Sequence, residues 1–355
     1  MKQKVTIQDI ADALGISRNT VSKAINNSEG LAEGTRDKIL QKAVEMGYKQ
    51  FSYVQTLTGI TNSKKQSVKR LKKPVGEIAL LTKFFPGQSH FASLMLDRFH
   101  RELSQLGYTM SMHLVEDDHI KSKSIPLTLV RGRISGIICI EMFDWDYDDM
   151  ICDLGIPTLY IDGPCKRDGR SLPADQLYME NTVGITKLVS DMIKAGKKRI
   201  GFIGNYEHCE SFFERYMAMR GTVLLAGETV RESHIVRENH IAEMKPHLQR
   251  IKELPDLFIC ANDFVAIEAL QAFQELGISV PEDVMLCGFD DSSESRLVEP
   301  SLTTVHIHTQ IMAYSAAHLL LSRIEEPSLD YRTIYTETDL ICRDSTKPVT
   351  GELNE

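Results

Sequence analysis

The chain has 355 residues, more than one hydrophobic core usually organises, so two or three domains are expected. Its composition, 42% hydrophobic and 25% charged, is ordinary for a soluble globular protein, and no apolar run approaches the roughly 20 residues that cross a bilayer. The seven cysteines form no Cys-x-x-Cys pair, which argues against a disulfide framework or a zinc site and favours a reducing compartment. With no secretory signal at the N-terminus, we expect a cytoplasmic protein with no cofactor and no membrane partner.

The formal net charge of −8 is unevenly distributed along the chain. Residues 1–74 contain 14 Lys and Arg against 6 Asp and Glu, a net charge of +8, which leaves −16 for the rest. A basic segment attached to an acidic body is typical of a nucleic-acid-binding module joined to a domain that does not bind nucleic acid. Charge alone fits a solvated basic tail equally well.

Two short helices are predicted at the start of the chain. Thr6 and Asp9 can form a capping box, after which apolar residues recur at helical spacing up to Gly15. Ser17 can cap a second helix, and Ala11 is the small residue that a close helix crossing needs. The inward-facing residues of the two helices are Ile7, Ile10, Ala11 and Leu14, then Val21, Ala24 and Ile25. The spacing predicts a helix-turn-helix, with a third helix over about 33–46 closing its core through Ile39, Leu40, Ala43 and Met46.

The N-terminal residues of the second helix of such a motif reach base edges in the major groove of DNA. Arg18 can bond bidentately to guanine and Asn19 to adenine, while Lys23, one turn further on, can reach another guanine or a phosphate. The short polar side chains are better placed for phosphates: Thr6, Ser17, Thr20, Ser22 and Asn26. For Thr6 and Ser17 the alternative role is helix capping, and the two roles can coexist.

The stretch VTIQDIADALGISRNTVSKAINNSEGLAEGTRDKILQKAVEMGY, residues 4–48, resembles the headpiece of the lactose/galactose-repressor family. The resemblance implies a headpiece, a hinge helix that enters the minor groove, and a two-lobed core like a periplasmic sugar-binding protein. It also implies that Arg18, Asn19 and Lys23 read bases, that Tyr48 belongs to the DNA-binding set, and that Leu57 wedges between base pairs. The hinge departs from the family pattern at Gln50, Phe51 and Val54, and a Lys-rich linker about ten residues longer than usual follows it.

From Val75 onward, apolar runs alternate with amphipathic stretches of helical length. The runs are GEIALLT, SGIICIEM, PTLYIDG, KRIGFIGN, PDLFICAND and DVMLCGFDD. Continuous apolar strands between helices predict an α/β fold, with parallel sheets covered by helices on both faces. About 280 residues in this rhythm are too many for one open sheet, and the resemblance implies two lobes. The predicted organisation is a headpiece at 1–49, a hinge and basic linker at 50–74, a core at 75–345 and a tail at 346–355, with one lobe at about 75–162 and 293–325 and the other at about 163–292 and 326–345.

Ligands of open parallel sheets bind beyond the carboxyl ends of the strands, so polar residues at those positions are candidates for a pocket. They are Glu141, Asp162, Asn205, Asn262, Asp263 and Asp290. The resemblance implies that Arg215, Asn262 and Asp290 bind the effector. Asn262 and Asp263 could instead cap the following helix, a role we favour for Asp263. Three aromatic residues could stack on a ring or simply belong to the core or rim: Phe91, Trp145 and Phe264. The predicted effector site comprises Phe91, Glu141, Arg215, Asn262 and Asp290.

Catalytic motifs are missing from the sequence, which contains no G-x-x-x-x-G-K, G-x-S-x-G or H-E-x-x-H. His306 and His308 would share one face of a strand, but no third ligand stands at metal-binding spacing, so we predict neither a metal site nor an enzyme.

The predicted function is a homodimeric transcription regulator, expected to be a repressor, whose DNA affinity is set by a small metabolite such as a sugar bound between the core lobes. Dimerisation is expected because one headpiece makes too few contacts to be specific, whereas two related by a two-fold axis read a palindromic operator in double-stranded DNA. One alternative keeps DNA binding but replaces the metabolite with a protein corepressor. Another is a transport-type solute-binding protein, which would need a signal peptide and no headpiece.

Overall fold

The computed structural model describes residues 6–25, 32, 35, 38–39, 42–43, 46, 75–84, 90–166 and 169–346, without the side chains of residues 25 and 90–94. These residues belong to two compact units, one ending at Arg70 and one beginning at Leu71. The predicted hinge and linker, with Leu57, lie outside the described residues, as do Asn26, Tyr48 and residues 347–355.

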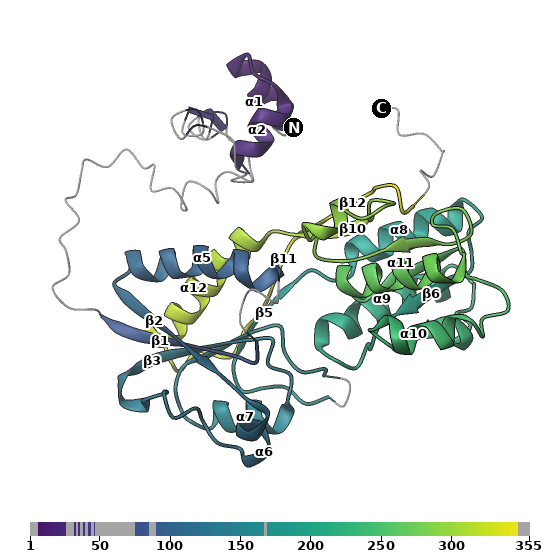
Figure 1. The fold of residues 1–355 in the computed structure, drawn as a ribbon. Coiled ribbons are helices and arrows are strands. Elements are labelled where there is room, and N and C mark those ends of the chain that lie inside the picture. The colour runs from purple at the N-terminus through teal and green to yellow at the C-terminus, as the bar shows by residue number, and fades with distance from the viewer. Residues whose placement is uncertain are drawn as a thin grey trace. The chain divides into compact units, whose positions relative to one another are not determined.

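The first unit contains the two predicted helices, α1 (Ile7–Leu14) and α2 (Arg18–Ile25) (Figure 1). The capping box is confirmed: the Asp9 amide donates to Thr6 Oγ1 (3.3 Å) and the Thr6 amide donates to Asp9 Oδ2 (2.7 Å). Gly15 ends α1 in the left-handed region at φ 65°, where glycine avoids the strain that a Cβ atom brings. The Thr20 amide then donates to Ser17 Oγ (3.1 Å), as the second cap predicts. Local chemistry therefore sets both helices and the turn between them.

A small apolar core holds the first unit together. Its fully buried members come from α1, from α2 and from the region of the predicted third helix: Ile10, Ala11, Val21, Ala24, Ile39 and Ala43. Residues 35, 38, 39, 42 and 43 are helical, in agreement with that third helix, and the rest of it lies outside the described residues. Since Ala11 is completely buried where α1 meets α2, a larger side chain there would force the helices apart.

The second unit is α/β, and the predicted fold class is confirmed. In its described residues, six strands form one parallel sheet in the order β11-β5-β4-β3-β1-β2. They are β1 (Gly76–Thr82), β2 (Tyr108–Leu114), β3 (Ile134–Ile140), β4 (Thr158–Ile161), β5 (Asp175–Met179) and β11 (Thr333–Thr336). Helices α5 (His90–Gln105) and α12 (Thr309–Glu325) pack together along this sheet, and α6 (Asp117–Ser122) and α7 (Trp145–Cys152) complete the lobe. Residues of α7 pack in a second apolar cluster with Ala79, Leu81 and Ile137.

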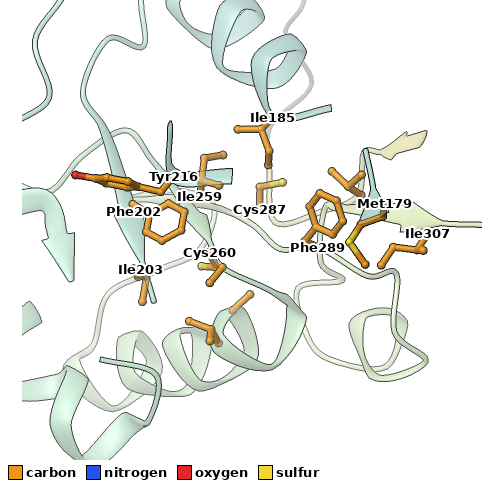
Figure 2. Close-up of a cluster of buried hydrophobic side chains, with 14 of the residues drawn as sticks. Met179, Ile185, Phe202, Ile203, Tyr216, Ile259, Cys260, Cys287, Phe289 and Ile307 are labelled. Atoms are coloured by element: carbon orange, nitrogen blue, oxygen red, sulfur yellow. The ribbon is translucent and has the colours of Figure 1, made fainter. Parts of the chain in front are cut away.

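The second lobe contains a parallel sheet in the order β7-β6-β8-β9. Its strands are β6 (Ile200–Ile203), β7 (Ile235–Val236), β8 (Leu257–Cys260) and β9 (Met285–Cys287), and its helices are α8 (Val183–Lys194), α9 (Glu210–Leu225), α10 (Ile241–Leu248) and α11 (Asp263–Leu276). An antiparallel pair, β10 (Thr304–Ile307) and β12 (Thr338–Ile341), lies beside it. Figure 2 shows part of the buried core of this lobe, where Phe202, Ile259 and Cys287 come from adjacent strands. Short 3-10 segments also lie within the lobes: Arg131–Arg133 precedes β3 in the first lobe, and Glu232–His234 and Glu294–Arg296 lie in the second.

The predicted lobe boundaries need correction. The structure assigns β5 and β11 to the first sheet, whereas the prediction put residues 163–292 and 326–345 in the second lobe. Conversely, β10 was predicted in the first lobe but joins the second through bridges Cys287–Thr303 and Asp290–His306. The physical reason is a long-range ion pair: buried Asp175 at the start of β5 accepts hydrogen bonds from Arg323 and Arg332, which hold β5 and β11 in the first sheet. Thr346, predicted in the tail, is buried with the second unit.

The chain passes from one lobe to the other in segments that lie side by side, one after β5 and one between β11 and β12. The Glu180 amide, just after β5, donates to the Thr336 carbonyl (2.8 Å), and Thr338 Oγ1 donates to the Glu180 carbonyl (2.9 Å). A further crossing lies between β10 and α12, at His308. Crossings that lie side by side form a hinge, because a few residues there can absorb a rotation of one lobe against the other.

Candidate DNA-binding helix and ligand cavity

The predicted base-reading residues lie on the exposed surface of α2. Arg18, Asn19 and Lys23 are all exposed, and all three lie within the α-helix. Ser17 and Thr20 are bonded to each other (Oγ to Oγ1, 2.7 Å), and Thr6 Oγ1 donates to Asp9 Oδ2 (2.8 Å). The capping role is therefore present for Thr6 and Ser17, whereas Ser22 is half-buried. The arrangement leaves one guanidinium, one amide and one ammonium group free of the apolar core and available to a partner.

A cavity of about 390 Å³ lies between the two lobes of the second unit. Its lining combines carboxylates, one guanidinium and aromatic rings: Phe84, Glu141, Phe143, Asp162, Met179, His208, Cys209, Phe212, Arg215, His240, Asn262, Phe264 and Asp290. Most of these residues follow the carboxyl ends of β1, β3, β4, β8 and β9 or lie at the start of α9. The volume is in the range of small-molecule sites, and the position is the one at which parallel sheets bind ligands.

The acidic residues that line the cavity have a strained backbone conformation. Glu141 (φ 54°), Asp162 (φ 52°) and Asp290 (φ 117°) are non-glycine residues in the left-handed region, each immediately or shortly after a strand. Such conformations cost about 1 to 3 kcal/mol each and persist where the surrounding structure holds them, often at ligand sites. The strain turns these side chains from the strand ends toward one cavity.

Arg215 on α9 is held firmly in the wall. Its Nε donates to Asn181 Oδ1 (2.9 Å), its Nη1 donates to the Ala261 carbonyl (2.7 Å), and its guanidinium stacks on the Phe289 ring at 3.5 Å from the centroid. Asn181 is itself buried and donates to Glu214 Oε2 (2.7 Å), next to the first crossing between the lobes. The guanidinium is therefore pre-positioned and cannot swing freely toward a ligand.

Asp290 is the acidic residue of the cavity wall that is most affected by burial. Burial raises the pKa of its carboxyl group well above the ordinary value, while the charge of Arg215 opposes that rise and the carboxylates of Asp263, Glu141 and Asp162 add to it. Within the described part of the chain its carboxylate accepts no hydrogen bond, although its amide donates to the Val305 carbonyl (2.8 Å). An acceptor that lines a cavity without a protein donor is available to a ligand.

The residue that caps α11, the helix after β8, is Asn262 and not the favoured Asp263. Asn262 caps α11, because its Oδ1 accepts from the Val265 amide (3.0 Å). Asp263, favoured as the cap, is buried instead and accepts from the Ser292 amide (2.7 Å) and Thr304 Oγ1 (2.6 Å). Its pKa rises to about 6, because burial outweighs these hydrogen bonds. Asn262 still lines the cavity, so its amide group combines a structural role with a surface open to a ligand.

The aromatic candidates have different outcomes. Phe264 lines the cavity and is 46% exposed. Trp145 does not line the cavity: its Nε1 donates to the Cys165 carbonyl (3.0 Å), Arg170 stacks on its ring, and it packs against the second apolar cluster, in agreement with a core residue. The side chain of Phe91 lies outside the described residues. Asn205 also lies away from the lining, where its Oδ1 accepts from the Glu207 amide (3.1 Å).

Several lining residues were not predicted. Phe84 and Phe143 lie just beyond β1 and β3, so extending the strand-end rule by two or three residues would have found them. His208, Cys209 and Phe212 come from the start of α9, and the ring of His208 meets Phe143 of the other lobe edge-to-face at 4.8 Å. No local pattern predicts that contact. His306 and His308, considered for a metal, instead pair with Asp291 (2.9 Å) and Asp339 (3.2 Å), and the described residues contain no cluster of three potential metal ligands.

The fold and the cavity define a class of protein: a helix-turn-helix module joined to a two-lobed ligand-binding core. Residues 6–50 match the model described as bacterial regulatory proteins, lacI family, and residues 189–346 match the periplasmic binding protein-like domain. The HTH-type transcriptional repressor PurR of Actinobacillus pleuropneumoniae serotype 3 (strain JL03) is 26% identical over 351 residues, 96% of this chain and 98% of its own length. The chain therefore combines a lacI-family DNA-binding domain with a periplasmic-binding-protein-like domain, and over nearly its whole length it is similar to a transcriptional repressor.

Solved structures agree on the fold. The transcriptional regulator CelR–cellobiose complex has a TM-score of 0.67 at 22% identity, covering 96% of this chain and 99% of that one. The lac repressor dimer bound to operator and the anti-inducer ONPF has a TM-score of 0.65 at 19% identity, covering 97% and 99%. Among the described helices of this chain, none has the length and apolar character of a membrane span.

Proposed function

We propose that the chain is a sequence-specific repressor that binds a palindromic operator as a homodimer and responds to a small molecule bound between its lobes. The observation that carries the proposal is a cavity lined by carboxylates, a guanidinium and aromatic rings between two hinged lobes, in a chain whose first helices form a helix-turn-helix. The relatives named for cellobiose and for operator binding support the same combination. Because the proposed partner is operator DNA, the proposal includes action in the cytoplasm.

The proposed mechanism uses both lobes. Glu141 and Asp162 approach the cavity from the first lobe, and Arg215 and Asp290 approach it from the second. A ligand that bonds residues of both lobes stabilises their closed arrangement, and this differential affinity is what shifts the affinity for DNA. Coupling of this kind typically amounts to about 1 to 3 kcal/mol. A cavity of small-molecule size favours such a ligand over the alternative of a protein corepressor.

Base reading is tested at Arg18. Arg18→Ala is expected to cost about 1 to 3 kcal/mol on the preferred operator and little on random DNA, because a bidentate contact to guanine discriminates between bases. Fluorescence anisotropy with both DNAs at one salt concentration measures the two losses. The control is Arg250→Ala, which removes the same charge from an exposed position on the surface of the second unit. Equal losses on both DNAs would reassign Arg18 to phosphate contact.

Ligand response is tested at Asp290. A thermal-shift screen first identifies a ligand, which at 100 times its dissociation constant adds about 2.7 kcal/mol of stability. Asp290→Asn is then expected to abolish the effect of that ligand on operator affinity and to leave unliganded operator binding nearly intact. Asp118→Asn, at an exposed carboxylate of the same unit, is the control. A full ligand response in Asp290→Asn would refute this assignment.

A further inference from the structure

One face of α9 is bound to the crossing that follows β5. In that crossing the buried Asn181 donates from Nδ2 to Glu214 Oε2 (2.7 Å) and to Ser211 Oγ (3.3 Å). Its Oδ1 accepts a hydrogen bond from Arg215 Nε (2.9 Å). The three partners on α9 are spaced i, i+3 and i+4, so they lie on one face of the helix. The same helix therefore supplies a wall of the cavity, at Arg215, and the contacts that hold the crossing.

Glu214 also reaches the first lobe. Its other carboxylate oxygen, Oε1, accepts a hydrogen bond from the hydroxyl group of Tyr335 on β11 (2.7 Å). The ring of Tyr335 stacks on Tyr178 of β5, with the centroids 5.5 Å apart, so the first sheet positions the hydroxyl group. Burial and then the Glu214 carboxylate raise the pKa of Tyr335, so its hydroxyl group keeps its proton near neutral pH and remains a donor. One carboxylate of the second lobe is therefore bound to both the crossing and the first sheet.

A rotation of one lobe against the other acts on these bonds. If the first sheet turns away from α9, Tyr335 must either leave Glu214 or pull it away from Asn181. Asn181 also holds Arg215, so the second path disturbs the cavity wall. The loss of one hydrogen bond changes an equilibrium of this kind by about two- to tenfold. The bonds of Glu214 therefore oppose the separation of the lobes.

We infer that Glu214 is a positioning residue that clamps the lobes together beside the cavity, because its one carboxylate binds Tyr335 of the first sheet and Asn181 of the crossing. The clamp sets how readily the cavity opens to admit or release a small molecule. The inference rests on the proposed function, since a clamp on the lobes regulates DNA binding only if the lobes control it. The three residues of the clamp lie outside the cavity lining, so their variants loosen the lobes without removing a lining side chain.

Cys209 is a natural probe of cavity opening. It directly precedes α9, lines the cavity and is only 1% exposed. Burial and then the Asp162 carboxyl group of the first lobe raise the pKa of its thiol well above the ordinary value, so the thiol reacts slowly in this arrangement. Separation of the lobes exposes the thiol and removes the neighbouring carboxyl group. The rate of alkylation of Cys209 therefore follows the open fraction.

The test is alkylation of the full chain by iodoacetamide at pH 7, with the rate at each cysteine followed by peptide mass spectrometry. Tyr335→Phe, which removes one hydroxyl group and keeps the ring, should raise the rate at Cys209 about two- to tenfold. Glu214→Ala should raise it at least as much, and Tyr335→Phe should add nothing in that background, because both changes remove the same bond. The rates at Cys139 and Cys287 should not change, since these residues are fully buried in different lobes and lie outside the cavity lining.

The matched controls are Tyr331→Phe and Glu243→Ala, both at exposed positions, which should keep the wild-type rate at Cys209. An unchanged rate at Cys209 in Tyr335→Phe overturns the inference. An equal rise at the two fully buried cysteines also overturns it, because the variant would then loosen the whole chain and not the contact between its lobes.

Operator affinity of the same variants separates this inference from the proposed function. A faster reaction of Cys209 with unchanged operator affinity supports the clamp and counts against control of DNA binding by the lobes. An unchanged reaction of Cys209 with altered operator affinity overturns the clamp and leaves the regulatory function standing.

Discussion

Replacing Asp175 by alanine is expected to lower the free energy of unfolding by about 3 to 5 kcal/mol. Asp175 is fully buried, and its carboxylate accepts from Arg323 Nε and Nη2 (3.0 Å each) and from the amide and Nη2 of Arg332 (2.7 and 2.9 Å). Although burial raises the pKa of Asp175, these hydrogen bonds and the nearby charge hold it below its ordinary value. Its loss would leave the Arg323 guanidinium buried without a counter-charge, and β11 without its anchor on β5.

Urea unfolding followed by far-UV circular dichroism measures this loss. The control is Asp97→Ala, which removes an exposed partner of Arg101 (3.0 Å) on α5 and is expected to cost only about 0 to 1 kcal/mol. A loss for Asp175→Ala as small as that of the control would contradict the role of Asp175 as the link that fixes both strands in the first sheet.

Stability is expected to fall steeply between pH 5 and pH 8 because of Asp148 on α7. This residue is fully buried, and neither of its carboxyl oxygens has a hydrogen-bond partner in the described part of the chain. Burial, assisted by the carboxylates of Asp144 and Asp149, raises its pKa to about 8, although nearby Tyr160 lowers it somewhat. The folded chain therefore holds a proton that the unfolded chain releases near pH 4, and the stability present at low pH is lost as the pH rises toward 8.

The slope from this one group is about 1.4 kcal/mol per pH unit, or roughly 4 kcal/mol between pH 5 and pH 8. Asp148→Asn removes the titrating group and should make the chain about 3 to 5 kcal/mol more stable than the wild type at pH 8. Chemical unfolding at several pH values tests this, with Asp97→Asn, at an exposed carboxylate on α5, as the control. Parallel stability curves for the wild type and Asp148→Asn would show that Asp148 is not held neutral.

What the sequence predicts well is local. The caps at Thr6 and Ser17 and the glycine turn depend on residues within a few positions of one another, so both helices of the first unit are readable without tertiary information. The strand-end rule is also local, and it correctly brought Glu141, Asp162, Asn262 and Asp290 to one cavity. Their roles as ligand contacts stay predictions, as do those of Arg18, Asn19 and Lys23 on DNA.

The sequence predicts poorly those features of the fold and the cavity that depend on residues far apart in the chain. The assignment of β5 and β11 rests on Asp175 meeting Arg323 and Arg332, which are about 150 residues away in the chain. Likewise, either Asn262 or Asp263 could cap α11, and the choice is made by Ser292 and Thr304. His208 lines the cavity because it lies just before α9, whose first residue contacts the other lobe. There the Lys166 amide donates a hydrogen bond to the Glu210 carboxylate (2.6 Å).

Selection of bound sites from a pool of random double-stranded DNA tests the central claim most directly. The wild-type chain is expected to enrich one palindromic sequence, bound at least about a thousandfold more tightly than random DNA at physiological salt, and Arg18→Ala is expected to lose the enrichment at the position it reads. Recovery of no common sequence, or of the same sequence with the same preference by Arg18→Ala, would contradict the account of α2 as a base-reading helix and of the chain as an operator-binding repressor.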